Sequence, residues 1–129
     1  MSVGVWEPKK PDHVGLDKMR ALLDAYRQAD PDDLAGTLPQ DSVRADAVLM
    51  KLDQNAWRDA EQLDNDELEA LIRFFTLAEM QLPGWEGGAS SPVIWLARMM
   101  RSRDAFTPEL RKWIKANSDN RFLPYGRAL

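Results

Sequence analysis

The sequence contains no cysteine and only one histidine, His13. The absence of cysteine excludes disulfides, thiol nucleophiles and cysteine-based zinc sites together. A zinc site without cysteine would depend mainly on carboxylates, which is unusual. We therefore expect no metal and no other cofactor, and no motif in the chain assigns a catalytic reaction.

Long apolar runs and strand-forming residues are also scarce. The longest strongly apolar runs, at residues 74–78 and 93–97, are too short to span a bilayer, and residues 1–15 lack the apolar core of a signal peptide. These features predict a soluble cytoplasmic protein with no membrane partner. Valine, isoleucine and threonine together number 12, against 16 leucines and 15 alanines. This balance favours helices over strands.

Apolar residues at helical spacing indicate one all-α domain of five to six helices. The clearest helix start is at Asp64, which can cap the helix while Glu67 completes a capping box. The helix predicted over about 64–80 is apolar around most of its circumference, so it needs cover on several sides. We therefore predict a bundle with this helix buried at its centre and with Leu71 and Phe75 in the core.

The remaining segments follow from periodicity and cap signals. We predict an extended N-terminal segment over residues 1–15, a helical domain over 16–120 and a tail over 121–129 that packs back on the domain. Within the domain, one helix covers about 16–29. The stretch from Asp41 to Leu63 is either one long kinked helix or two helices. Ser91 and Thr107, each followed by proline, start two more helices.

Charge is distributed unevenly along the chain. Residues 1–86 contain 9 Lys and Arg against 18 Asp and Glu, whereas residues 87–129 contain 8 against 3. Such asymmetry is typical of chains that contact nucleic acid or a partner. It is equally typical of a chain whose two parts attract each other. The sequence leaves both interpretations open.

The basic helix after Thr107, the glycine-rich loop at 84–88 and the C-terminal segment form the candidate binding surface. Exposed tryptophan and arginine dominate interface energetics, although a tryptophan in such a loop more commonly folds back onto the core. The candidate residues for contact with a partner or with nucleic acid are Arg98, Arg101, Arg111, Lys112, Lys115 and Trp85.

The favoured function is non-catalytic, with the chain binding a protein partner or associating with itself. The first alternative is nucleic-acid binding, because the last two helices resemble a helix-turn-helix whose second helix carries cations and then Asn117 and Asn120. The turn lacks glycine, Glu109 lies where early base contacts would fall, and the isoelectric point is near 5.0. The second alternative is an enzyme whose carboxylates converge only in the fold.

Two stretches, FFTLAEMQLPGW and WIKANSDNRFLPYG, resemble parts of small bacterial all-helical proteins that have no assigned activity. The resemblance extends over residues 74–125. It implies a soluble bacterial helical domain and carries over no functional residue.

Overall fold

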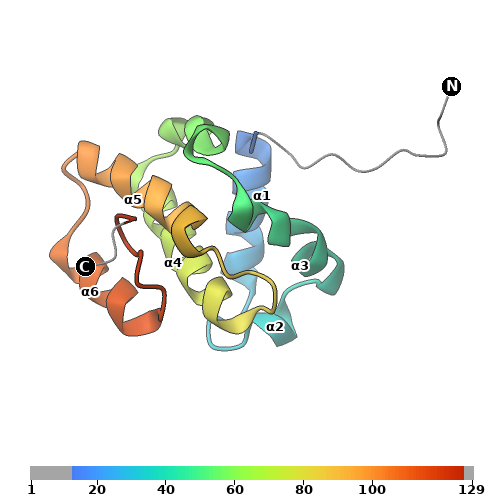
Figure 1. Ribbon diagram of the computed structural model, residues 1–129. Helices are drawn as coiled ribbons and strands as arrows, with labels where there is room; N and C mark the ends of the chain where they lie inside the picture. The colour runs from blue at the N-terminus through green and yellow to red at the C-terminus, as the bar shows by residue number, and fades with distance from the viewer. Residues whose placement is uncertain (1–12, 127–129) are drawn as a thin grey trace, which may run out of the picture.

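The computed structural model describes residues 13–126, and α4 (Asn65–Gln81) is the helix around which the others are arranged (Figure 1). Its start is fixed locally. The Asp64 carboxylate accepts a hydrogen bond from the Glu67 backbone N–H at 2.8 Å, and the Glu67 carboxylate accepts one from the Asp64 N–H at 3.1 Å. Leu63, just before the cap, and Leu68, at the end of the first turn, are both buried, as in a hydrophobic staple. The predicted capping box is confirmed.

The other three helices of ten or more residues cover α4. α1 (Leu16–Gln28), α5 (Pro92–Ser102) and α6 (Pro108–Asn117) all pack against it. Leu71 and Phe75 are fully buried, as predicted. Within residues 13–126 the structure has six α-helices, three 3₁₀ helices and no strand. The predicted all-α bundle with a buried central helix is confirmed.

An aromatic cluster fills the core beside α4. The ring of Phe74 lies 5.1 Å from that of Phe75, 5.5 Å from Tyr26 and 5.9 Å from Trp85, measured between centroids. Trp57 meets Phe75 edge-on at 5.4 Å. Such aromatic pairs contribute about 0.5–1.5 kcal/mol each beyond the burial of their apolar surface. The cluster therefore joins α1, α4 and the segments before and after α4 into one core.

The connection between α1 and α4 differs from the prediction in its winding. It contains the short helices α2 (Leu34–Thr37) and α3 (Gln40–Asp46), followed by the 3₁₀ helices η2 (Ala47–Lys51) and η3 (Gln54–Gln62). The break falls near residue 53, as expected, because the Asp53 side chain accepts a hydrogen bond from the Ala56 N–H at 3.2 Å and so starts η3. The α-helical winding expected after residue 46 is wrong. Side-chain spacing over so short a stretch does not separate 3₁₀ from α geometry.

Both predicted starts of the last two helices are confirmed. The side chains of Ser91 and Thr107 each accept a backbone N–H of the following turn, and a proline occupies the first helical position in each case. A short 3₁₀ helix, η4 (Gly88–Ser90), precedes Ser91. At the far end of α5, the Arg103 guanidinium donates to the carbonyl oxygens of Glu61 and Leu63 at 2.7 and 2.8 Å. These bonds fix α5 to the start of α4.

Residues 121–126 return towards α5 after the end of α6. In Figure 1 they lie between α5 and α6, on the side of the molecule opposite to α2 and α3. Leu123 and Pro124 are buried there. This segment therefore forms a wall beside the two basic helices.

Two expectations fall partly or wholly outside the described residues. The predicted extended segment at 1–15 is described only from His13, and the predicted tail only as far as Gly126. Within residues 13–126, no helix has the length and apolar character needed to cross a membrane. The expected cytoplasmic location stays a prediction.

Candidate functional site

The structure brings four of the six sequence-predicted site residues together around one surface hollow. This hollow has a volume of about 660 Å³ and is formed by α5, α6 and residues 121–126. None of the residues that line it is acidic. We call it the basic hollow, and its lining residues are Arg98, Arg101, Arg111, Lys115, Leu123, Pro124 and Tyr125.

The two guanidinium groups from α5 are held in place by residue 125. Arg98 donates from Nη2 to the Tyr125 carbonyl oxygen at 2.9 Å, and its Cζ lies 5.2 Å from the centroid of the Trp95 ring. Arg101 stacks over the Tyr125 ring, with Cζ 4.6 Å from the ring centroid. Both arginines nevertheless remain exposed. Because neighbours already restrict these side chains, a ligand that contacts them incurs less loss of conformational entropy.

The two cations from α6 are exposed and make no ion pair with any described residue. Arg111 and Lys115 are four residues apart, so they lie on one face of the helix. Lys112 is also exposed, but it is not among the residues that line the basic hollow. At about 100° per residue, Lys112 projects almost directly away from the buried residues Leu110 and Ile114.

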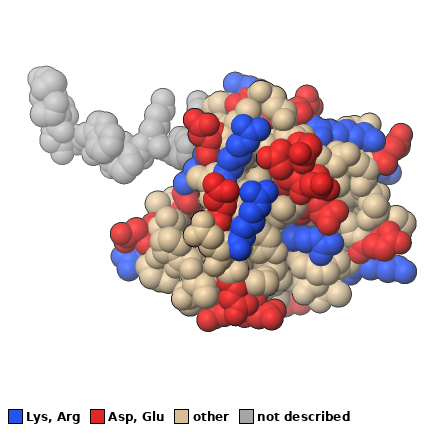
Figure 2. All heavy atoms as spheres, turned by 180° about the vertical axis from the view of Figure 1, so that it is seen from behind, with Lys and Arg blue, Asp and Glu red and all other residues tan. Residues whose placement is uncertain are grey.

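The cations of the basic hollow do not neutralise the acidic part of the chain. No ion pair within residues 13–126 involves any of the four, whereas Lys18 pairs with Asp46 and Arg73 with Glu69 in the earlier part. On the face shown in Figure 2, acidic and basic side chains are interspersed. In the basic hollow, by contrast, the charge has one sign. Of the two interpretations of the charge asymmetry, a free basic surface fits the described residues.

Trp85, the sixth predicted site residue, is not at the surface. Its side chain is 1% exposed, and Nε1 donates to the Val43 carbonyl oxygen at 2.9 Å. The expectation that it contacts a partner is therefore wrong. The loop that carries it turns inward because the Trp85 ring packs edge-on against Phe74 in the aromatic core.

A buried carboxylate, Glu79, positions the wall of the basic hollow. Its oxygens accept hydrogen bonds from the Gly87 N–H at 2.9 Å, the Ser91 hydroxyl at 2.7 Å and the Asn120 amide at 3.1 Å. Asn120 in turn accepts the Phe122 N–H at 2.9 Å. Glu79 thus connects α4 to the start of α5 and to the segment that follows α6.

Sequence reasoning missed the Glu79 network, although one signal was present. At about 100° per residue, Glu79 lies about 80° from Glu69, inside the apolar arc of α4 and away from the narrow polar stripe that carries Glu69 and Arg73. A charge in an apolar arc points to a buried, hydrogen-bonded carboxylate. The side-chain amide of Asn120, which the nucleic-acid alternative would use, is engaged with Glu79 and with the Gly88 carbonyl oxygen.

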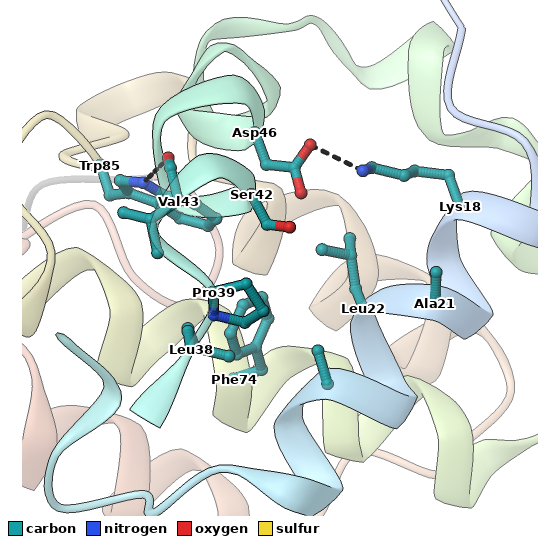
Figure 3. Close-up of a pocket in the computed structure, with 11 residues that line it drawn as sticks. Lys18, Ala21, Leu22, Leu38, Pro39, Ser42, Val43, Asp46, Phe74 and Trp85 are labelled. Carbon is teal, nitrogen blue, oxygen red and sulfur yellow. Dashed lines mark hydrogen bonds and ion pairs between the residues drawn. The ribbon is translucent and has the colours of Figure 1, made fainter. Parts of the chain in front are cut away.

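A second concavity lies between α1 and α3 and has a volume of about 80 Å³ (Figure 3). It is mainly apolar, with Phe74 and Trp85 in its lining. At its edge, Lys18 from α1 contacts Asp46 from α3 at 2.7 Å. Because this ion pair satisfies both charges, the pocket presents no unpaired charge to a ligand. It is also smaller than the roughly 300–1,000 Å³ of ordinary ligand sites.

The only histidine has a structural contact. His13 Nε2 lies 2.8 Å from Asp59 Oδ2, and the adjacent Val14 N–H donates to the Ala56 carbonyl oxygen at 2.8 Å. These contacts hold the chain before α1 against η3. Within residues 13–126 no three metal-ligating side chains gather into a site.

Comparison of the chain with protein-family models, with curated proteins and with solved structures finds no significant match. The basic hollow and its geometry are therefore the basis for a functional assignment.

Proposed function

We propose that this protein is a non-catalytic binding protein whose basic hollow holds an acidic segment of a partner protein. One observation carries the proposal: four exposed cations from two helices surround a single hollow and make no ion pair with any described residue. Arginine clusters of this kind recognise acidic and phosphorylated motifs. Complementary charge also raises association rates and suppresses wrong partners.

The arrangement of the cations favours a protein segment over a nucleic acid. In a helix-turn-helix the second helix presents its outward face to the major groove. Here Arg111 and Lys115 of α6 line a hollow together with Arg98 and Arg101 of α5. Of the three cations of α6, only Lys112 lies outside this hollow. A phosphate backbone would also extend beyond the hollow onto a chain whose net charge is −4. Nucleic-acid binding is therefore kept as the alternative result that the binding experiment below can detect.

The acidic segment has two possible sources, another protein or a second copy of this chain. Residues 1–86 carry twice as many acidic as basic side chains, 18 against 9, so a second copy offers acidic segments of its own. Sedimentation velocity over a range of concentrations separates the two sources. Salt-sensitive assembly that is lost in Lys115→Glu would identify a second copy as the partner.

The direct test measures fluorescence anisotropy with three probes: a degenerate Glu/Asp-rich peptide pool, the matching Gln/Asn-rich pool, and nucleic acid as duplex DNA or single-stranded RNA. We expect only the acidic pool to bind, with an affinity that falls as salt increases. Lys115→Glu should weaken this binding about tenfold or more, the equivalent of about 1.4 kcal/mol.

Lys112→Glu is the matched control, because it makes the same charge change on the same helix outside the basic hollow. It should change the affinity for the acidic pool by no more than about twofold, because salt screens the effect of an exposed charge that does not contact the peptide. If duplex DNA or RNA binds more tightly and Lys112→Glu matters as much as Lys115→Glu, the nucleic-acid alternative is correct. If no probe binds in the micromolar range, the proposal is wrong.

A further inference from the structure

The basic hollow holds more positive charge than a single carboxylate can neutralise. Two guanidinium groups on α5 and a guanidinium and an ammonium group on α6 surround it, and its described lining contains no acid. An aspartate or glutamate side chain brings one negative charge. A phosphorylated side chain brings about 1.5–2 negative charges and three strong acceptor oxygens.

The guanidinium groups retain donors for such a ligand. The Arg98 guanidinium uses one N–H for the Tyr125 carbonyl oxygen, and the Arg101 guanidinium makes no hydrogen bond with any described residue. A guanidinium has five N–H donors in a planar fork that matches the oxygens of a phosphate. The donors on α5 are therefore numerous and already restricted in position, while Arg111 and Lys115 on α6 add unpaired charge.

The size and the wall of the basic hollow favour a phosphorylated peptide over a free nucleotide. A volume of about 660 Å³ leaves room for the residues that flank a phosphorylated side chain. The Tyr125 ring is poorly placed to stack on a base, because Arg101 already covers it at 4.6 Å and Phe106 packs against it at 5.5 Å.

We infer that the basic hollow recognises a phosphorylated serine or threonine in its protein partner. The inference rests on the proposed function and specifies the group that the site binds. Phosphorylation would then act as the switch for binding, because the added oxygens make one to three charge-assisted hydrogen bonds that an unmodified hydroxyl does not make.

The experiment compares three degenerate peptide pools that differ only at a central position, which is phosphoserine, glutamate or serine. Binding to the full chain is measured by fluorescence anisotropy at fixed ionic strength. We expect the phosphoserine pool to bind at least about tenfold more tightly than the glutamate pool, and the serine pool to bind most weakly. Because the residues on either side of the central position are randomised, the result does not depend on one chosen peptide sequence.

A pH series gives a second readout. The second pKa of a phosphomonoester is about 6, whereas that of a glutamate side chain is about 4.3. Affinity for the phosphoserine pool should therefore fall as the pH is lowered through about 6, while affinity for the glutamate pool stays level over that interval. A parallel fall for both pools would show that the dianion is not the species recognised.

The variants Arg111→Glu and Lys115→Glu should each remove the preference for phosphoserine, and Lys112→Glu should keep it. All three side chains are exposed and make no ion pair with described residues, so circular dichroism should report an unchanged fold. Equal binding of the phosphoserine and glutamate pools would overturn this inference and leave the proposed function standing. Failure of both pools to bind would overturn both.

Discussion

Removal of the buried carboxylate of Glu79 tests how the fold holds the wall of the basic hollow. Glu79 is 8% exposed and accepts hydrogen bonds from Gly87, Ser91 and Asn120. The Glu79 carboxylate also lies beside the start of α5, where the helix dipole favours negative charge. In Glu79→Ala the backbone N–H of Gly87 and the hydroxyl of Ser91 lose a partner inside the protein, so we expect a large loss of stability.

The magnitude follows from the number of donors that lose their acceptor. Each buried donor without a partner costs about 1–3 kcal/mol. Asn120 keeps its second hydrogen bond to the Gly88 carbonyl oxygen at 3.0 Å. The full cost therefore applies to only two donors, the Gly87 N–H and the Ser91 hydroxyl. Part of their cost is offset because the variant no longer buries a charge. We expect a net loss of about 3 kcal/mol, which for a domain of this size lowers the melting temperature by about 12 °C.

Glu69→Ala is the matched control, because it removes the same side chain from the same helix. Glu69 makes a surface ion pair with Arg73 at 3.0 Å, and such a pair contributes about 0.3–0.5 kcal/mol. Urea unfolding should give an unchanged slope and a lower midpoint for Glu79→Ala, and almost no change for Glu69→Ala. Equal losses in the two variants would refute the argument that the Glu79 network supports the fold.

Three further predictions concern the core, the basic helix and the partly buried phenol of Tyr26. Phe75→Ala should cost about 3–5 kcal/mol in urea unfolding, and a loss below about 1 kcal/mol would mean that α4 is not central. The triple variant Arg111→Glu, Lys112→Glu, Lys115→Glu should keep its melting temperature nearly unchanged, and a fall of about 10 °C or more would make these cations part of the scaffold. Burial raises the pKa of Tyr26 above 10.0. The folded chain therefore keeps a proton that the unfolded chain loses, and stability should fall as the pH rises above about 10. The difference between the absorbance titrations of the wild type and of Tyr26→Phe gives the pKa of this phenol. An ordinary or lowered pKa would contradict the shift.

Local signals in the sequence predicted most of the fold. The capping residues Asp64, Ser91 and Thr107 act within one helical turn, so their effect does not depend on the rest of the chain. The winding after Asp46 was not predictable in this way, because side-chain spacing over so few residues does not distinguish α from 3₁₀ geometry. The break at Asp53 was predictable, since it is again a local cap.

The candidate site was predictable residue by residue but not as an assembly. Arg98, Arg101, Arg111 and Lys115 were named as candidate residues from the sequence, and all four are exposed in the structure. Their convergence depends on the relative position of α5 and α6, which no pattern within either helix encodes. Trp85 was named as a candidate contact residue but is buried, because a loop sequence does not reveal whether the core has room for an indole ring.

The basic hollow owes its geometry to a group of the opposite charge. Glu79 fixes Asn120, and Asn120 accepts the N–H of Phe122 at the point where the last described segment leaves α6. Tyr125, three residues later, then holds Arg98 through its carbonyl oxygen and Arg101 through its ring. Within residues 13–126 the acidic and basic parts of the chain are thus joined by the hydrogen bonds of the buried Glu79 carboxylate and by those of Arg103, and no ion pair links them. Because this coupling uses none of the cationic groups of α6, the fold can be stable while the charge in the basic hollow stays available to a partner.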